Sequence, residues 1–390
     1  MKKLSFVFFL FSCLCLNAQE SDPYETAQIS ILTIGPGYSL NDAFGHNGIR
    51  VRTSFTDVVF DYGRYPFNDP NFYLNFARGK LIYSQGLSKY QDVVDYYKSQ
   101  KRSIQEQVLD LSNEEKRDLH AFLIDNALPA NRDYLYDFFY DNCATKIRDV
   151  IEEFTQSQIT YHDVPSVGHS SFRQLINENL DWNSWGSLGI NIALGSVIDI
   201  EATVREHMFL PKYVQALFQE ASLDDSNRPL VLRSEMINAD QRNLKRTNFL
   251  LSPVFILACI ASLILIITFK DHKNRSRSRW MDMSIFFVTG VIGLFLLLLW
   301  FGTDHTTTAN NYNLLWAFAL NLIFILHINK RQPKPWLVKY LKFLIILLIL
   351  MSLHWIIGVQ RFAPALLPLL FALFIRYLFL VKTLNRPTDP

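Results

Sequence analysis

The stretch 140-YDNCAT-145 places a cysteine at the first turn of a predicted helix. Asp141 or Asn142 can cap this helix, because a short polar side chain accepts hydrogen bonds from the first free amides. The positive end of the helix dipole stabilises a thiolate, and amides left unpaired at a helix start can bind an oxyanion. We therefore predict that Cys143 is a nucleophile and that Asn142 supports the start of its helix. The alternative is a buried cysteine that packs as a small apolar residue.

A cysteine nucleophile needs a base, and His46 in the stretch FGHNGIRV directly precedes a predicted strand. The hairpin formed by this strand and the next one is expected to turn near residues 54–55. Folding the hairpin back places Asp61 roughly opposite Asn47, one position from His46. Asp61 would then orient the imidazole as the third member of a catalytic triad.

Several other polar residues are candidates for the same site. Asn41 and Asp42 compete for the third catalytic position, and Asn47 and Arg50 are candidates to face a substrate. The remaining histidines of this region are scattered and show no ligand spacing such as HExxH, so we predict no catalytic metal. The sequence contains no glycine-rich phosphate loop and no GxSxG motif, and it implies no organic cofactor.

The elements that must position these residues lie within residues 19–248. Strand-like stretches, rich in β-branched and aromatic residues, cover 29–37, 44–54 and 57–65. Helical patterns follow at 88–100, 112–128 and 143–154. The second of these begins with a capping box formed by Ser112 and Glu115. This order of elements predicts an α+β domain.

The N-terminus and the cysteine distribution both indicate export. MKKLSFVFFLFSCLCLNAQE combines two lysines, an apolar run and small residues, which is typical of a secretory signal cleaved after Ala18. Lipidation at Cys13 and an uncleaved anchor are the alternatives. Since Cys13 and Cys15 lie in the signal and Cys259 lies in an apolar run, Cys143 has no disulfide partner in its domain. An unpaired thiol in an oxidising compartment needs a reason, which strengthens the case for a nucleophile.

Five apolar segments follow, and each approaches the ~20 residues that span a bilayer. They are Phe249–Phe269, Ser284–Phe301, Tyr312–Ile328, Phe343–Val359 and Phe362–Val381. Lys and Arg are concentrated in the loops after the first and third segments, and only Arg361 lies in the other two loops. This positive-inside pattern places the soluble region outside the membrane and the C-terminus in the cytoplasm. The net charge of +2 gives no indication of a nucleic-acid partner.

These observations predict five divisions of the chain: a signal peptide at 1–18, a catalytic domain at 19–235, a linker at 236–248, a membrane domain at 249–381 and a cytoplasmic tail at 382–390. The loop 302-GTDHTTTANNYN-313 would lie on the outer side and carries Asp304 and His305. One interpretation is a solvated loop, which fits its threonines. The other is a polar floor that meets lipid headgroups or the active site.

Four stretches resemble the Lnb family of bacterial lipoprotein N-acyltransferases, in the order that the family has them. They are FGHNGIRV, YDNCAT, LGSVIDIEATVREHMFLPKYV and FGTDHTTTANNYNLLWA. The soluble region also resembles a permuted papain-like or NlpC-like thiol fold, in which the histidine precedes the cysteine in the chain. The resemblance implies that His46 and Cys143 are the catalytic pair. It leaves the role of Asp61 open and suggests that Asp304 and His305 matter.

The activity that the resemblance implies is ping-pong acyl transfer in the bacterial inner membrane. A membrane phospholipid would donate an acyl chain to Cys143, and the α-amine of a diacylglyceryl-cysteine lipoprotein would accept it. A thiol hydrolase on the same residues, acting as a phospholipid deacylase, amidase or peptidase, is one alternative. A non-catalytic sensor or scaffold of the envelope is the second.

Overall fold

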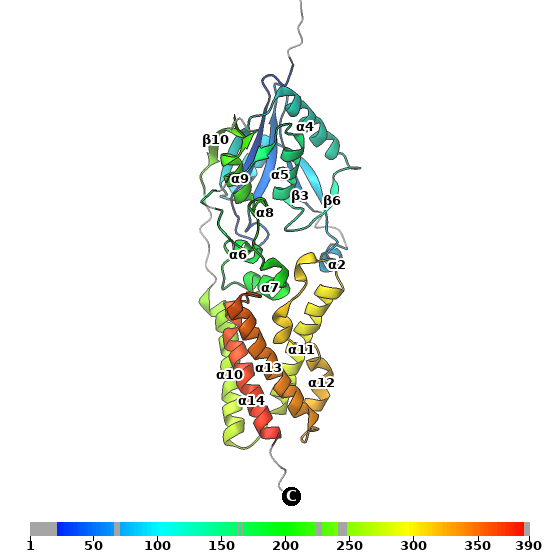
Figure 1. The fold of residues 1–390 in the computed structure, drawn as a ribbon, viewed down its shortest axis with the longest axis vertical. Helices are drawn as coiled ribbons and strands as arrows, with labels where there is room; N and C mark the ends of the chain where they lie inside the picture. Colours follow the sequence, from blue (N-terminus) through cyan, green and yellow to red (C-terminus); the bar gives the residue numbers. More distant parts are fainter. Residues whose placement is uncertain are drawn as a thin grey trace, which may run out of the picture.

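A computed structural model describes residues 22–65, 71–162, 164–165, 167–223, 228–240 and 248–385. The chain forms an α+β domain stacked end to end on a bundle of long helices (Figure 1). This architecture confirms the predicted order of an α+β domain followed by a helical domain. The predicted signal peptide lies outside the described residues.

The α+β domain is built on a seven-stranded antiparallel sheet in the order β10-β5-β1-β2-β3-β4-β6. Its strands are β1 (Gln28–Ile34), β2 (His46–Arg52), β3 (Asp57–Arg64), β4 (Ile82–Lys89), β5 (Ile104–Leu109), β6 (Asp133–Leu135) and β10 (Val231–Asn238). A small sheet joins β7 (Ile159–Thr160), β8 (Ser222–Leu223) and β9 (Arg228–Pro229).

Helices cover both faces of the large sheet. Successive strand residues point to opposite faces, so each strand contributes to two apolar layers. One layer packs against α4 (Asn113–Asn126), α5 (Cys143–Phe154) and α9 (Pro211–Glu220). The other layer packs against α3 (Tyr90–Ser99). Shorter helices follow the strands: α2 (Phe72–Arg78), α6 (Phe172–Asn177), α7 (Trp185–Ala193), α8 (Val204–His207) and the 3-10 turn η1 (Ser196–Ile198).

The β2–β3 hairpin turns over residues 53–56, close to the predicted position, but its register differs from the prediction. Asp61 pairs with Gly48 rather than with Asn47. A shift of one residue moves a side chain to the other face of a sheet. With the observed register, Asp61 shares the face of His46, two positions along β2, and the two side chains can meet diagonally.

The predicted linker at 236–248 begins too early. The stretch preceding the bundle forms β10, an edge strand that pairs with β5 through Asn238. The prediction failed because β10 lies at the edge of the sheet and most of its side chains are exposed. Its polar residues therefore resemble those of a loop. Residues 241–247 lie outside the described residues.

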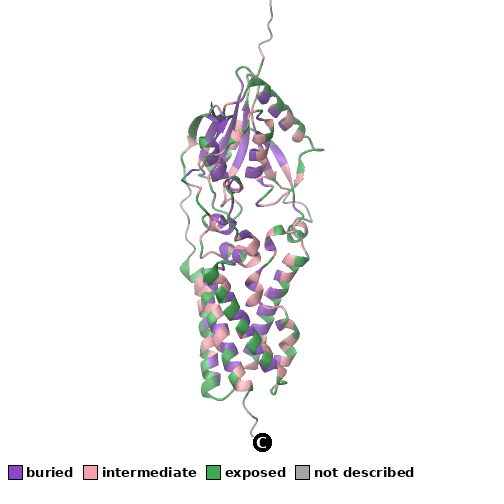
Figure 2. Ribbon diagram, viewed as in Figure 1, coloured by how far each residue is buried: buried purple, intermediate pink, exposed green. Residues whose placement is uncertain are grey.

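Four helices of the C-terminal domain are long and apolar enough to cross a membrane. They are α10 (Pro253–Lys273), α11 (Arg279–Phe301), α13 (Trp336–Ile357) and α14 (Leu367–Leu384), the last preceded by the 3-10 turn η5 (Pro364–Leu366). Apolar side chains between the helices are buried, whereas those on the outer faces are exposed (Figure 2). Outward apolar faces of this length are what a lipid bilayer would cover.

The third predicted span, Tyr312–Ile328, is not one continuous helix. It consists of the 3-10 turn η4 (Tyr312–Leu315), an irregular stretch and α12 (Asn321–Ile328). The eight residues of α12 rise only about 12 Å. The segment begins beside Gln360, near the α+β domain, and ends beside Arg277, at the opposite end of the bundle. It therefore traverses the bundle as a broken span, and the prediction of five transmembrane helices is not confirmed.

A buried ion network closes the end of the bundle that lies farthest from the α+β domain. Arg376 of α14 is fully buried and contacts Asp271 and Asp282 at 2.7 and 2.8 Å. Arg277 pairs with Asp282 at 2.8 Å. Charges buried in this way are tolerated only when paired, so the network ties α10, α11 and α14 together.

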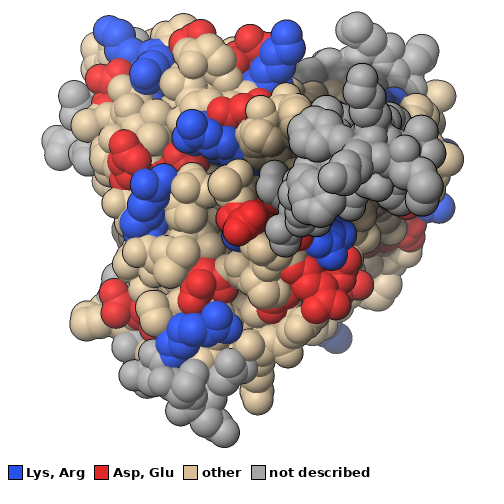
Figure 3. All heavy atoms as spheres, turned by 90° about the horizontal axis from the view of Figure 1, so that it is seen from above, with Lys and Arg blue, Asp and Glu red and all other residues tan. Residues whose placement is uncertain are grey.

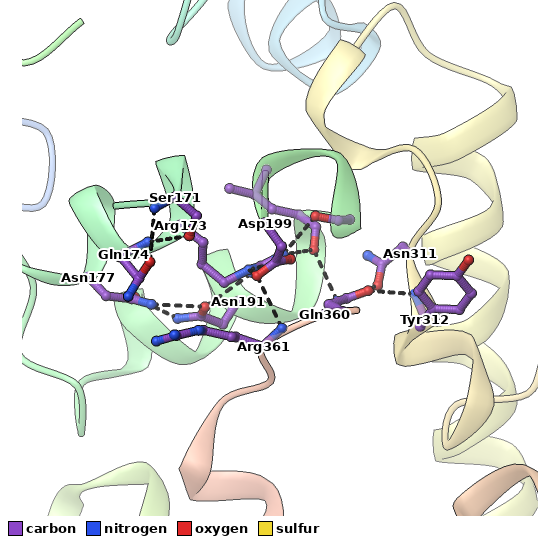
Figure 4. Close-up of polar contacts among 12 residues, drawn as sticks. Ser171, Arg173, Gln174, Asn177, Asn191, Asp199, Asn311, Tyr312, Gln360 and Arg361 are labelled. Atoms are coloured by element: carbon purple, nitrogen blue, oxygen red, sulfur yellow. Dashed lines mark hydrogen bonds and ion pairs between the residues drawn. The ribbon is translucent and has the colours of Figure 1, made fainter. Parts of the chain in front are cut away.

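A second buried polar network joins the bundle to the α+β domain (Figure 4). Arg173 of α6 donates to both carboxylate oxygens of Asp199 at 3.0 Å, and Asp199 accepts the backbone N–H of Arg361 at 3.1 Å. Asn311 donates to two carbonyl groups at the end of α7, and Gln360 donates to the next carbonyl along the chain. The α+β domain is thus fixed to the bundle by side-chain contacts as well as by the connecting chain.

The face of the α+β domain that lies farthest from the bundle carries interspersed charges. Lys and Arg side chains alternate with Asp and Glu side chains over the part that Figure 3 shows in colour. A surface of mixed sign generates no strong field of either sign.

Candidate active site

Cys143 is the first residue of α5, and the loop before it is held tightly. Asn142 caps the helix: its side-chain oxygen accepts the N–H groups of Ala144 and Thr145 at 2.8 and 3.0 Å. The amide nitrogen of Asn142 donates to the carbonyls of Phe138 and Phe209 at 2.7 and 2.8 Å. All polar atoms of this side chain are therefore engaged, so Asn142 positions the cysteine and is not a free donor.

This capping changes the expected oxyanion site. We expected free N–H groups at the helix start to bind an oxyanion. The N–H groups of Ala144 and Thr145 instead donate to the side chain of Asn142. Among the described residues, the N–H of Cys143 has no intramolecular acceptor. The backbone amide of Cys143 is therefore the free donor at this helix start, and it is suited to bind a negative charge that develops next to the sulfur.

His46 begins β2, at the end of the sheet that points toward the bundle; it contacts Asp61 and lies near Cys143. Its Nε2 lies 3.0 Å from Oδ2 of Asp61. The thiol of Cys143 is near enough for its charge and hydrogen bonding to act on the imidazole. Because Asp61 engages Nε2, the other ring nitrogen, Nδ1, remains for the thiol. The three predicted catalytic residues therefore lie together in the structure.

Two glycines leave space around Asp61. Asp61 pairs with Gly48 on β2 and with Gly86 on β4, so neither neighbour in its row carries a side chain. The guanidinium of Arg64 fills the space over Gly86, where an added Cβ would lie 1.7 Å from Nε. Arg64 donates to Oδ1 of Asp61 at 2.8 Å. The carboxylate is thus held by His46 on one oxygen and by Arg64 on the other.

Arg64 and Gly86 were not identified from the sequence. The pairing of β3 with β4 could not be aligned in advance, because the segment that contains α2 separates the two strands and a register shift lies between Asp61 and Arg64. Gly63 adopts a positive φ of 97° at this shift and lies beside Cys143. A glycine within the strand pattern DVVFDYGRY was the one available signal of such a bulge.

The pKa values of His46 and Asp61 are displaced in opposite directions. Burial alone lowers the pKa of His46, but Tyr97, Cys143 and Asp61 outweigh it and raise this pKa well above 6.5. Burial alone raises the pKa of Asp61, but the hydrogen bond and charge of His46, together with Arg64, lower it below 3.8. Cys143 and Asp61 therefore favour the protonated form of His46, which suits a group that takes up a thiol proton and then delivers it to a leaving group.

A cluster of tyrosine side chains includes Tyr136, which lies near Cys143. Tyr83 packs between Tyr136 and Tyr65, with ring centroids 4.1 and 5.0 Å apart. Burial, followed by the charge of Cys143, raises the pKa of Tyr136 well above 10. Burial likewise raises the pKa of Tyr83 to about 12. These phenols remain protonated at neutral pH and present an apolar surface beside the thiol.

The two other residues predicted from the FGHNGIRV stretch are structural. Asn47 is fully buried and donates to Thr33 and to the carbonyl of Leu32. Arg50 is buried over the ring of Tyr90, and it pairs with Asp57 and Glu106 at 2.7 and 3.0 Å. Neither side chain is open to a substrate, which corrects the prediction. The sequence could not show this because the β1 and β5 partners are remote in the chain.

The competitors of Asp61 also have other partners. Asp42 accepts a hydrogen bond from Ser39 at 2.6 Å and pairs with Arg102 at 3.5 Å. Asn41 interacts with the hydroxyl of Tyr65. Neither residue contacts His46 among the interactions of the described chain.

Asp304 and His305 contact the α+β domain. The N–H of Asp304 donates to the carbonyl of Arg78 at 2.8 Å, and Nε2 of His305 donates to the carbonyl of Phe76 at 2.9 Å. Gly79 permits this approach, because an added Cβ would lie 2.7 Å from the nitrogen of His305. Of the two interpretations of the GTDH loop, the structure favours a floor that meets the soluble domain.

The same loop reaches the segment that precedes Cys143. Thr306 donates to the carboxylate of Asp137 at 3.1 Å. The other carboxylate oxygen of Asp137 accepts the N–H groups of Phe139 and Tyr140 at 2.8 and 3.0 Å. Asp137 also pairs through its backbone with Asp141. The bundle therefore braces the turn that carries Cys143.

No group of three or more His, Cys, Asp and Glu side chains is arranged to hold a metal ion within the described ranges. The arrangement of Cys143, His46 and Asp61 is suited to nucleophilic chemistry at a thiol. Such chemistry uses a base beside the nucleophile and a carboxylate that orients the base.

Two family models match the chain. Residues 16–178 match the family described as Lnb N-terminal periplasmic domain, and residues 245–386 match the family described as Lnb transmembrane domain. The first match contains His46, Asp61 and Cys143, and the second contains the whole bundle. Comparison with curated proteins gives no match, and comparison with solved structures gives none. The chain belongs to the Lnb family, with a periplasmic α+β domain followed by a helical membrane domain.

Proposed function

We propose that this protein is a lipoprotein N-acyltransferase. It moves an acyl chain from a membrane phospholipid, through a thioester on Cys143, to the α-amine of a diacylglyceryl-cysteine lipoprotein. The observation that carries the proposal is that His46 is hydrogen-bonded to Asp61 and lies near Cys143, at the end of the sheet nearest the bundle. Membership of the Lnb family supports the same reaction.

The first half of the reaction forms the thioester. The thiol proton of Cys143 passes to His46, and the sulfur attacks the carbonyl carbon of a phospholipid ester. The N–H of Cys143 stabilises the oxyanion of the tetrahedral intermediate. When the intermediate collapses, the ester C–O bond breaks and His46 donates its proton to the departing alkoxide, which leaves as a lysophospholipid. Asp61 keeps the imidazolium oriented throughout.

The second half transfers the acyl chain. The free α-amine of the lipoprotein attacks the thioester, His46 accepts a proton from the amine, and the C–S bond breaks to regenerate the thiol. An amide is more stable than a thioester, so this step is favourable. The proposal requires no metal and no organic cofactor.

The surroundings of the thiol support an acyl transferase at a membrane surface. The polar network around Asp199 and Asn311 fixes the α+β domain to the bundle, so the thiol is held close to the lipid. Acyl chains anchor both substrates in the bilayer, so a thiol held at a fixed height above the bilayer lies close to both. In this proposal the catalytic domain faces the periplasm, and the basic loops and C-terminus lie in the cytoplasm of a bacterial inner-membrane protein.

The test is a two-substrate reaction with purified protein in liposomes. Phospholipid and a synthetic diacylated lipopeptide should yield an N-acylated lipopeptide and a lysophospholipid in equal amounts. Cys143→Ala should abolish both products, whereas Cys259→Ala should retain both. Free fatty acid in place of the N-acylated lipopeptide would identify a hydrolase. Full function of Cys143→Ala and His46→Ala in cells would indicate a sensor or scaffold.

A further inference from the structure

An exposed apolar surface lies where the α+β domain meets the bundle. Six residues form it: Leu40, Trp182, Trp185, Phe249, Leu250 and Leu251, each between 44% and 64% exposed. We call this set the apolar rim. Exposed apolar patches on this scale are uncommon on surfaces that face water, and they mark contact with a partner or with lipid.

The height of the rim is set by the first membrane helix. Residues 249–251 directly precede Ser252, the N-cap of α10, whose 21 residues extend about 31 Å and match the hydrocarbon thickness of a bilayer. The indole N–H of Trp185 donates to the carbonyl of Leu251 at 2.9 Å. Asn183 accepts the N–H of Val254 at 3.0 Å. These hydrogen bonds hold the start of α7 at the same height along the bundle as the start of α10.

The two tryptophans suit this position. Trp side chains favour the membrane interface, because the ring is apolar and the N–H remains hydrogen-bonded. In Trp185 the N–H is satisfied by the protein, while the side chain remains half exposed. The apolar ring is thus free to contact lipid without leaving a polar atom unpaired.

The rim is continuous with the loop that leads to His46. Leu40 lies in the connection between β1 and β2 and packs on the first turn of α7, where a Cβ added to Gly186 would lie 3.0 Å from it. Further along the same connection, Phe44 packs against Phe138 with ring centroids 4.9 Å apart. The β1–β2 loop therefore connects the rim to both parts of the site. Phe44 lies two residues before His46, and its partner Phe138 lies a few residues before Cys143.

We infer that the apolar rim lies within the outer headgroup layer of the membrane and that a phospholipid acyl chain reaches Cys143 along it. The occupant is bilayer lipid, because the rim continues the exposed apolar surface of α10. The lipid contact is independent of the reaction. The access route rests on the proposed function.

Depth measurements test the lipid contact. Single cysteines at Leu40→Cys, Trp182→Cys and Phe55→Cys, in a Cys143→Ser and Cys259→Ala background, are labelled with an environment-sensitive fluorophore in liposomes. Phe55 is the matched control, since it is an exposed apolar residue at the β2–β3 turn. Nitroxide lipids labelled near the headgroup should quench positions 40 and 182, and aqueous iodide should quench position 55.

Three outcomes would overturn the lipid contact. Positions 40 and 182 could respond to iodide as position 55 does, which would place the rim in water. They could be shielded from both quenchers, which would indicate that a protein or a second copy covers the rim. Position 182 alone could be quenched by lipid, in which case the rim would not extend to the loop of His46.

A kinetic comparison tests the access route. Leu40→Asn should lower kcat/KM for phospholipid in a bilayer about tenfold, because the lost apolar contact is roughly that of one leucine. It should leave kcat/KM for a water-soluble short-chain phospholipid unchanged, and Phe55→Asn should change neither. An equal loss with both donors would overturn the access route. If the wild type forms no acyl product with either donor, the proposed function fails while the depth result still stands.

Discussion

The Asp61–His46 contact makes a quantitative prediction for Asp61→Asn. The substitution keeps the shape of the side chain but removes the charge that His46 and Arg64 contact at 3.0 and 2.8 Å. Both Asp61 and His46 are less than one-fifth exposed, so solvent screens their contact little. A hydrogen bond to a charged group contributes about 1.5–3 kcal/mol. If that energy is used in the transition state, kcat should fall about 10- to 150-fold.

The pH dependence of the same variant is also predicted. Asp61 is one of the groups that raise the pKa of His46, so its loss should lower that pKa. In the proposed reaction, His46 donates a proton when the lysophospholipid leaves. The decline of kcat at alkaline pH should therefore begin at a lower pH in Asp61→Asn than in the wild type.

The assay is single-turnover formation of the acyl-enzyme, followed by mass spectrometry across a range of pH. Asp57→Asn is the matched control, because Asp57 is on the same strand and pairs with Arg50 instead of His46. Asp57→Asn should preserve both kcat and the pH at which kcat begins to decline on the alkaline side. A wild-type kcat and pH profile for Asp61→Asn would refute the assigned role of this carboxylate.

Three further predictions follow from the described contacts. Gly86→Ala should displace the Arg64 guanidinium, since the added Cβ would lie 1.7 Å from it, and acyl-enzyme formation should slow to the rate of Arg64→Ala; an unaffected rate would show that Arg64 does not support Asp61. The free energy of unfolding of the wild type should exceed that of Asp61→Asn most strongly at pH values between the pKa of Asp61 and the pKa of His46. This difference should shrink as pH falls through the lowered pKa of Asp61, and also as pH rises through the raised pKa of His46. Thermal unfolding at several pH values measures this difference, and a difference independent of pH would contradict the linkage. Arg376→Leu should destabilise the bundle by about 3–5 kcal/mol, because buried Asp271 loses its guanidinium partner and buried Asp282 retains that of Arg277 alone. Thermal unfolding in detergent measures the loss, and an unchanged midpoint would show that the network is not needed.

Local signals in the sequence were sufficient to find the residues that meet at the site. Cys143 was identified from a capping residue followed by an apolar helical pattern, and the structure places it at the first position of α5. His46 was identified at the start of a strand, where β2 begins. Asp61 was reached through a short hairpin, whose turn fixes the pairing to within one residue. Each of these inferences depends on neighbours close in the sequence.

Features that depend on distant contacts could not be predicted. Arg64 contacts Asp61 only because Gly86, on another strand, leaves room for it. Asn47 belongs to the same motif as His46, but its partners on β1 bury it. The role of the GTDH loop required the position of α2 against the bundle.

The membrane domain shows a related limit of sequence patterns. Hydropathy measures whether a segment prefers lipid, and it identified all four long helices. It does not measure helix continuity, so the broken span at Tyr312–Ile328 was expected to be one helix. Asn321 at the break donates to Thr289 and accepts from Tyr340, partners that lie on other helices.

The most direct test of the central claim is the intact mass of the purified protein after incubation with phospholipid alone. The wild type should gain one acyl group, mapped to Cys143 by peptide sequencing, and a diacylated lipopeptide added afterwards should remove it as an amide. His46→Ala should gain none. An acyl group that maps to another residue, or N-acylation of the lipopeptide by Cys143→Ala, would contradict the account.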